Sequence, residues 1–213
     1  QNTIIGSLAG DALTASNYNV AIGYAALSTE TLGERNIAIG KSALQTSNIT
    51  TATAANNIAV GYHAGLSITT GIHNVIIGGT AGDALTDADY NTVLGSNALS
   101  ADTLGSQSTA VGFNALATQN FTTATNSLNT AVGYQAGLNV TTGIQNTLMG
   151  ALAGDALTDA DYNVAIGYAA LGADTLGSRS VAIGYAALDA QNFTTSTDSY
   201  NTAVGFEAGG AIT

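Results

Sequence analysis

One nine-residue phrase recurs along this chain and limits what it can fold into. "NVAIGYAAL" occurs at residues 19–27 and again at 163–171, and "SVAIGYAAL" occurs at 180–188. Twelve related units begin at an Asn or Ser, with spacings of 17, 17, 21 and 17 residues that then repeat as a 72-residue super-repeat. Such self-similarity is typical of arrays in which each unit packs on its neighbours. We expect one repeat domain over 1–213, cut from a longer chain, with super-repeats at 2–73, 74–145 and 146–213.

Each unit predicts one short strand. After the Asn or Ser come Thr, Val or Ile, then an apolar residue, then Ile, Val, Leu or Met, and then Gly, two variable residues and Ala. A β-branched run closed by Gly indicates a strand followed by a turn, and no segment has the 3.6-residue period of a helix. Twelve strands in the same phase predict an all-β parallel β-solenoid, a rod of roughly 58 Å at about 4.8 Å per coil.

The invariant Gly and Ala of the unit have a packing explanation. Gly suits a position that needs positive φ or a close backbone approach, and Ala suits a corner too crowded for a larger side chain. The leading Asn is expected to hydrogen-bond to the Asn of the next coil as an amide ladder, which Ser108 and Ser180 could do only weakly. We interpret the invariant pair as structural, as at Gly23, Ala26, Gly95, Ala98, Gly167 and Ala170.

The strand pattern also favours association of chains. Alternate side chains of a strand point to opposite faces, yet the middle strand position and both of its neighbours are apolar or β-branched in every unit. A strand on the outside of a lone solenoid should alternate apolar with polar, whereas one covered on both sides is apolar throughout. We therefore expect both faces of the strands to be buried, one of them against another chain.

The units resemble a known family. "NVAIGYAAL", "NTAVGYQAG" and "STAVGFNAL" are similar to the Hep/Hag repeats in the heads of trimeric autotransporter adhesins, and the match extends over essentially the whole chain. Longer phrases such as "GYQAGLNVTTGIQNTLMG" and "DALTDADYNVAIGYAAL" are more similar to repeats of bacteriophage tail fibres, particularly marine phages, and of tail-fibre-like surface proteins. The resemblance implies a homotrimer of left-handed parallel β-rolls with the strands lining the threefold interior. The 17- and 21-residue units are longer than those of the adhesin heads.

Composition excludes several classes of partner. The chain has 3 Lys and Arg against 14 Asp and Glu, a net charge of −11, so nucleic acid and anionic lipid surfaces would be repelled. No run of eighteen apolar residues exists to cross a membrane. The absence of cysteine excludes a disulfide framework and is compatible with an extracellular or a cytosolic location.

Acidic residues offer the only candidate for a metal site. Carboxylates gather after the invariant Ala in the first unit of the second and third super-repeats, and three oxygen ligands could hold Ca²⁺. The first super-repeat keeps only Asp11 of the three, so solvated turn residues are the favoured interpretation and no cofactor is expected. The candidate calcium ligands are Asp83, Asp87, Asp89, Asp155, Asp159 and Asp161.

Nothing in the pattern indicates catalysis. Paired carboxylates in repeated loops differ from the single acid–base pair of a glycosidase. His63 and His73 become Gln one super-repeat later and have no nucleophile at a recognisable spacing. We expect no enzymatic activity, and the Thr residues are too irregularly spaced for an ice-binding lattice.

Aromatic residues recur directly after the strand Gly. They could contact a receptor or the faces of sugars, or they could cover coil edges and subunit seams, which is the interpretation that we favour. The possible receptor contacts are Tyr24, Tyr62, Tyr134, Tyr168 and Tyr185.

The sequence thus predicts a structural protein. We expect a shaft or head segment of a trimeric phage tail fibre or bacterial surface adhesin, located outside the cell, that contributes to attachment to a receptor or glycan. The alternative is a self-assembling extracellular filament or stalk with a matrix role. The Thr-rich insertions of the 21-residue units lie where solenoids usually display binding surfaces.

Overall fold

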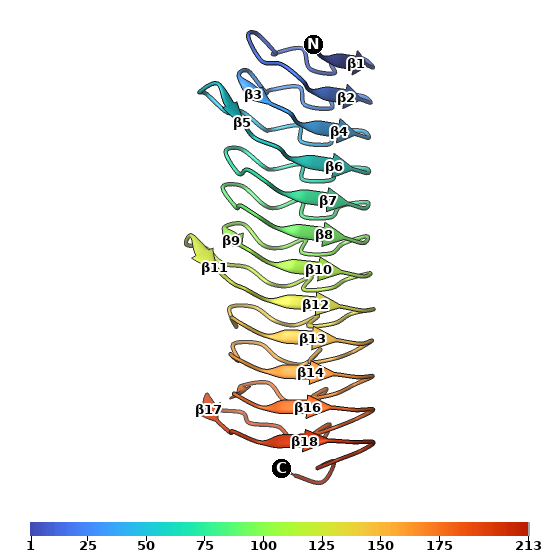
Figure 1. Cartoon of the computed structure of the whole chain (residues 1–213), viewed down its shortest axis with the longest axis vertical. Coiled ribbons are helices and arrows are strands. Elements are labelled where there is room, and N and C mark those ends of the chain that lie inside the picture. The colour runs from blue at the N-terminus through green and yellow to red at the C-terminus, as the bar shows by residue number, and fades with distance from the viewer. Residues whose placement is uncertain (213) are drawn as a thin grey trace.

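The computed structural model describes residues 1–212 as a rod of stacked coils with one strand at the same place in each coil (Figure 1). These strands form a single twelve-stranded parallel sheet that runs the length of the rod. This confirms the predicted β-solenoid, although each strand spans three residues because the chain turns at the flanking Asn and Gly. The strands are β1 (Thr3–Ile5), β2 (Val20–Ile22), β4 (Ile37–Ile39), β6 (Ile58–Val60), β7 (Val75–Ile77), β8 (Thr92–Leu94), β10 (Thr109–Val111), β12 (Thr130–Val132), β13 (Thr147–Met149), β14 (Val164–Ile166), β16 (Val181–Ile183) and β18 (Thr202–Val204).

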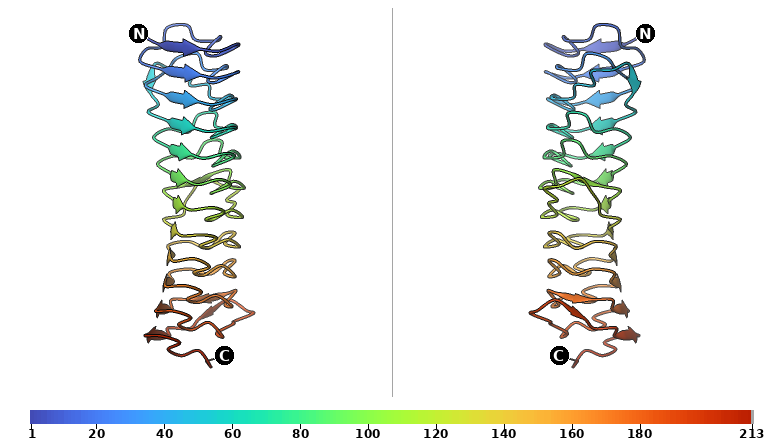
Figure 2. Two further views of the ribbon diagram at one scale, coloured as in Figure 1. Left: turned by 90° about the vertical axis from the view of Figure 1, so that its right-hand side faces the viewer. Right: turned by 90° about the vertical axis from the view of Figure 1, so that its left-hand side faces the viewer.

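The 21-residue units bulge from one side of the rod. Each carries an extra strand that pairs in parallel with a short strand of the coil before it, and Figures 1 and 2 show these bulges at three heights. Ile49 and Phe121 tuck inward beneath the bulges and are 6% exposed, whereas Phe193 is half-buried. The pairs are β3 (Gly33–Glu34) with β5 (Thr53–Ala54), β9 (Gly105–Ser106) with β11 (Thr125–Asn126), and β15 (Gly177–Ser178) with β17 (Thr197–Asp198).

The Gly that closes each main strand is required by its backbone. Gly23 has a φ of +128°, and a Cβ there would lie 2.6 Å from the carbonyl oxygen of Gly40 in the next coil. Its equivalents share this conformation, so a column of glycines lets successive turns stack closely. The Ala three positions later faces the interior, and Ala26 is fully buried.

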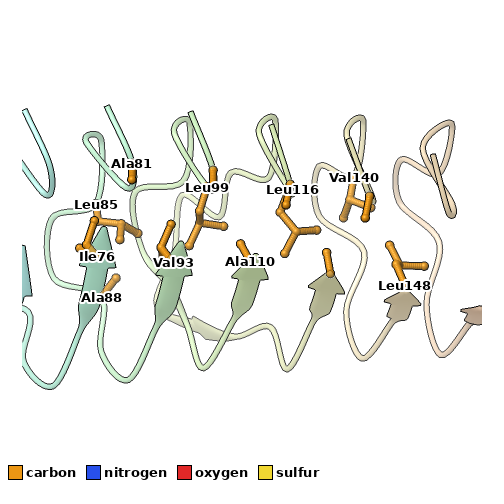
Figure 3. Packing of buried hydrophobic residues seen from close by; sticks show 14 of the residues in the cluster. Ile76, Ala81, Leu85, Ala88, Val93, Leu99, Ala110, Leu116, Val140 and Leu148 are labelled. Carbon is orange, nitrogen blue, oxygen red and sulfur yellow. The ribbon is translucent and has the colours of Figure 1, made fainter. Parts of the chain in front are cut away.

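The core is filled differently in the four coils of a super-repeat. In the first coil a large strand residue such as Ile76 is fully buried opposite Gly82, and Leu85 lies beside them. In the second and third coils the strand residue is small, usually Ala, and a buried Leu replaces the Gly, as Leu116 does opposite Ala110. Figure 3 shows these residues pointing toward one another from the strands and from the opposite turns. In the fourth coil both positions are small, as at Ala131 and Gly137, and Leu116 and Leu148 of the neighbouring coils reach the space beside the Gly. The core is thus filled jointly by strand, turn and neighbouring coils.

The leading Asn residues join successive coils, but mainly through the backbone. The Oδ1 of Asn74 accepts the backbone N–H of Asn91, and its Nδ2 donates to the carbonyl oxygen of Ala88 at 2.7 Å. The expected amide-to-amide ladder is therefore largely an amide-to-backbone ladder, with weak side-chain links at 3.3 Å only between some neighbours, such as Asn74 and Asn57. A fully buried amide can satisfy both of its polar atoms in this way.

Candidate functional site

One face of the rod combines the strands with a column of residues at each edge. In every coil the middle strand residue points inward, so Ala21 is fully buried while Val20 and Ile22 remain half-exposed. We call the outward side the outer strand face. It comprises, in each coil, the residue before the leading Asn or Ser, the first and third strand residues, and the residue after the closing Gly.

The centre of the outer strand face carries one column that is apolar along the whole rod and, beside it, a column that mixes Thr with apolar residues. Its first strand position is Thr in six coils and Val or Ile in the other six. Its third strand position never carries a polar residue, and several members are more than a third exposed, among them Ile77 at 37% and Leu94 at 47%. The third-position residues are Ile5, Ile22, Ile39, Val60, Ile77, Leu94, Val111, Val132, Met149, Ile166, Ile183 and Val204.

Both edges of this face carry exposed aromatic residues. The column that follows the closing Gly includes the five tyrosines considered above as receptor contacts or as covers of coil edges, and all five are between 48% and 53% exposed. The column that precedes the strands contains Tyr18, Tyr90, Tyr162 and Tyr200, all exposed. These five tyrosines are Tyr24, Tyr62, Tyr134, Tyr168 and Tyr185.

Many of these rings stack on one another along the rod. The ring centroids of Tyr168 and Tyr185 are 5.3 Å apart, and those of Tyr185 and Phe206 are 5.1 Å apart, with interplanar angles of 13° and 8°. On the other edge the Arg179 guanidinium lies 4.5 Å from the centroid of the Tyr162 ring. A ring whose faces contact its neighbours presents only its edge and hydroxyl outward. This geometry favours stabilisation of adjacent coils over sugar stacking, which uses an open ring face.

Charge is distributed unevenly around the rod. The outer strand face holds all three Lys and Arg residues of the chain, Arg35, Lys41 and Arg179, and none of the 14 Asp and Glu residues. Of the acids near its margin, Asp198 forms an ion pair with Arg179 at 3.1 Å. The face is therefore acid-free in a chain whose net charge is −11.

The structure does not bring the candidate calcium ligands together. Within residues 1–212 no group of three or more His, Cys, Asp or Glu residues is placed to share a metal ion. Asp87 instead accepts a hydrogen bond from the Thr70 hydroxyl at 2.6 Å, and Asp89 accepts one from the backbone N–H of Ile72 at 2.8 Å. Asp159 and Asp161 repeat these contacts one super-repeat later, and Asp83 and Asp155 are half-buried, where burial raises the pKa of both carboxyls. Asp87, Asp89, Asp159 and Asp161 therefore join successive coils through single hydrogen bonds.

Three other carboxylates, which the sequence interpretation did not single out, are fully buried. Glu30, Asp102 and Asp174 occupy the same position in the second coil of each super-repeat and are 0% exposed. Asp102 accepts the backbone N–H groups of Gly105 and Phe121, both at 3.0 Å, and a hydrogen bond from the Gln119 side chain at 2.6 Å. Aligning the units reveals them as acids at a position where the first and fourth coils carry Leu, Ile or Val.

The residues described contain no helix that could span a membrane. Comparison with family models, with curated proteins and with solved structures finds no match to this chain.

Proposed function

We propose that this chain is a structural fibre segment that associates side by side through its outer strand face. The assembly is a homotrimer of left-handed β-rolls that forms the shaft or head of a phage tail fibre or a bacterial surface adhesin outside the cell. The single observation that carries this proposal is that the outer strand face carries no acid and has an apolar third strand residue in every coil. The repeat resemblance described above supports a threefold arrangement.

A second copy of the chain is the partner that the charge distribution favours. The outer strand face carries no acid, whereas the rest of the chain carries 14 Asp and Glu, three of them fully buried. Copies that meet through this face bury apolar side chains and leave the exposed carboxylates toward solvent, where water solvates them. A basic partner would instead be attracted to the opposite surfaces, away from the apolar strip.

The Thr-rich bulges give the fibre its outward contact surface. They recur once per super-repeat on one side of the rod, and their tips, such as Thr122, Thr123 and Ala124, are exposed. Loops held on a rigid scaffold commonly carry binding functions. In the proposed fibre these bulges contribute to attachment to a cell-surface receptor or glycan.

Light scattering after size exclusion tests the association directly. We expect a mass of about three times 21.1 kDa that persists on dilution. Ile39→Lys places a charge in the centre of the face, so this variant should give a smaller mass while keeping its β-sheet circular dichroism. Thr123→Lys adds the same charge on a bulge and should leave the mass unchanged. A folded wild-type monomer of 21.1 kDa would refute the proposal.

A further inference from the structure

We infer that the hydrogen-bond network beneath the first bulge binds one buried water molecule, held between Asn36 and the pair formed by Glu30 and Ser47. The site lies inside a single chain, so the inference stands apart from the proposed trimer. It concerns the first of three equivalent buried networks, one in each super-repeat. In the other two networks a glutamine amide occupies the place that the water takes here.

Asn36 carries a buried amide nitrogen without a partner. The residue is fully buried, and within residues 1–212 its Nδ2 is the one buried side-chain nitrogen or oxygen that makes no hydrogen bond. The amide cannot simply be reversed, because its Oδ1 accepts the backbone N–H of Asn57 at 3.1 Å and a nitrogen there would face another donor. Burying an unpaired donor is costly, so an acceptor is expected at Nδ2.

The path of the 21-residue unit explains why this amide has lost its usual acceptor. In each complete 17-residue unit the leading Asn donates from Nδ2 to the carbonyl oxygen fourteen positions later, as Asn19 does to Gly33 at 3.0 Å. Fourteen positions after Asn36 lies Thr50, an exposed residue of the first bulge. The bulge therefore carries away the carbonyl group that the other units supply.

The second super-repeat shows which group fills this place there. Ser108 stands at the position of Asn36, and Gln119 stands at the position of Ser47. The Gln119 Nε2 donates to the Asp102 carboxylate at 2.6 Å and to the Ser108 hydroxyl at 2.9 Å. One nitrogen atom thus bridges the buried acid and the leading residue of the unit. The third network repeats both contacts.

The first network lacks this bridge and is smaller by one atom. Its five positions are Glu30, Asn36, Ser47, Ala55 and Asn57, where the later networks carry Asp, Ser, Gln, Ser and Asn. The exchange of Gln for Ser removes three side-chain atoms and that of Ser for Ala removes one, whereas Asn adds two and Glu adds one, hydrogens not counted. The missing atom equals one water oxygen.

A water molecule satisfies the groups that line the site. It accepts the hydrogen bond from Asn36 Nδ2 and donates to oxygens of Glu30 and Ser47, and about three bonds are typical of a buried water. Among residues 1–212 only the Ser47 hydroxyl donates to Glu30 Oε2, at 2.7 Å, so this oxygen has room for a second donor. An anion would face the carboxylate and a cation would face the amide N–H, so a neutral donor and acceptor is the ligand that fits.

A high-resolution crystal structure of the wild-type chain tests the site, and the two later networks are controls in the same crystal. We expect a water about 2.7–3.2 Å from Asn36 Nδ2 and from an oxygen of Glu30 or Ser47. No water should occupy the equivalent place in the later networks, where the glutamine amide lies. An Nδ2 that bonds to a protein group, or that has neither water nor partner, overturns the inference. Because every atom of the site belongs to one chain, this result does not depend on the oligomeric state.

A triple variant tests whether the water stands in for the amide. Glu30→Asp with Asn36→Ser and Ser47→Gln gives the first network the acid, the serine and the glutamine of the later ones. In its crystal structure the new glutamine Nε2 should lie where the water lay, within hydrogen-bond distance of the carboxylate and the serine. A water that persists at that place in the folded variant overturns the inference, and the wild-type structure decides alone if the variant does not fold.

Discussion

At the scale of single residues, the buried carboxylates explain how the rod tolerates its longer coils. Asp102 sits beneath the bulge of the following coil and accepts the N–H of Phe121, at a point where the path of the 21-residue unit departs from that of the coil before it. In the first super-repeat the longer Glu30 pairs with the shorter Ser47, where the later copies pair Asp with Gln. A carboxylate with several donors satisfies backbone groups that an aliphatic side chain would leave unpaired.

Burial makes the stability contribution of Asp102 depend on pH. Desolvation raises its pKa above the ordinary value of 3.8, although hydrogen bonds from Gln119, Phe121, Gly105 and Thr103 act in the opposite direction. A folded-state pKa above the unfolded value gives stability that is fully present below pH 3.8 and is lost as the pH rises through the folded pKa. The stability advantage of wild type over Asp102→Asn should therefore be larger at pH 3.8 than at pH 7.

Thermal unfolding of both proteins at the two pH values measures this difference. Asp83→Asn serves as the comparison. Burial also raises the pKa of the Asp83 carboxyl, but this side chain is only half-buried and does not belong to a hydrogen-bond network beneath a bulge. A wild-type advantage over Asp102→Asn that grows toward neutral pH would show that the hydrogen bonds outweigh desolvation.

At the scale of elements, neighbouring coils fill the core together, because a large strand residue in one coil occupies space left by glycines in its own coil and in the coil before it. Leu148 in β13 is fully buried, and its methyl groups fill the space that a side chain at Gly137 or Gly154 would need. Ile76 does the same in β7, one super-repeat earlier. The strand residue and the two glycines around it therefore form one packing unit.

Leu148→Ala should destabilise the rod by about 2–5 kcal/mol, because Gly137 and Gly154 offer no atoms that could fill the cavity. Leu148→Ile is the matched control, since Ile76 occupies the equivalent place, and it should cost less than about 1.5 kcal/mol. Thermal unfolding can compare them, at about 2 to 4 °C per kcal/mol for a chain of this size. An alanine variant as stable as the isoleucine variant would contradict this account of the core.

The sequence alone predicts the element that recurs and not all of its contacts. The β-branched run, the closing Gly and the invariant Ala locate every main strand and its turn, because stacking repeats the same local demands in each coil. One unit alone does not distinguish the buried Asp102 from the exposed Asp87, since both are acids in turn segments, and only the alignment of units shows apolar residues at the position of Asp102. Whether a ring such as Tyr185 offers its face or its edge depends on the coil stacked on it, which no single unit reveals.

At the scale of the whole molecule, the charge pattern sets how assembly should respond to salt. Each chain has a net charge of −11, and the proposed interface contains no acid and only three cations at its edges. Bringing three such chains together adds mutual repulsion between their acidic surfaces, while the buried strip itself is apolar. Electrostatics therefore oppose this assembly, and burial of apolar area drives it.

Raising the salt concentration should consequently strengthen association in the proposed trimer. The screening length falls from about 30 Å at 0.01 M to about 10 Å at 0.1 M, so repulsion between acidic surfaces fades while the apolar contact is little affected. Sedimentation equilibrium at the two concentrations should show a lower dissociation constant at 0.1 M. Arg179→Gln tests whether the edge cations hold the chains together. If ion pairs held the interface, the dissociation constant of wild type would rise with salt, and that of the variant would depend less on salt. A dissociation constant that rises with salt would mean that charged contacts, and not the apolar strands, hold the chains together.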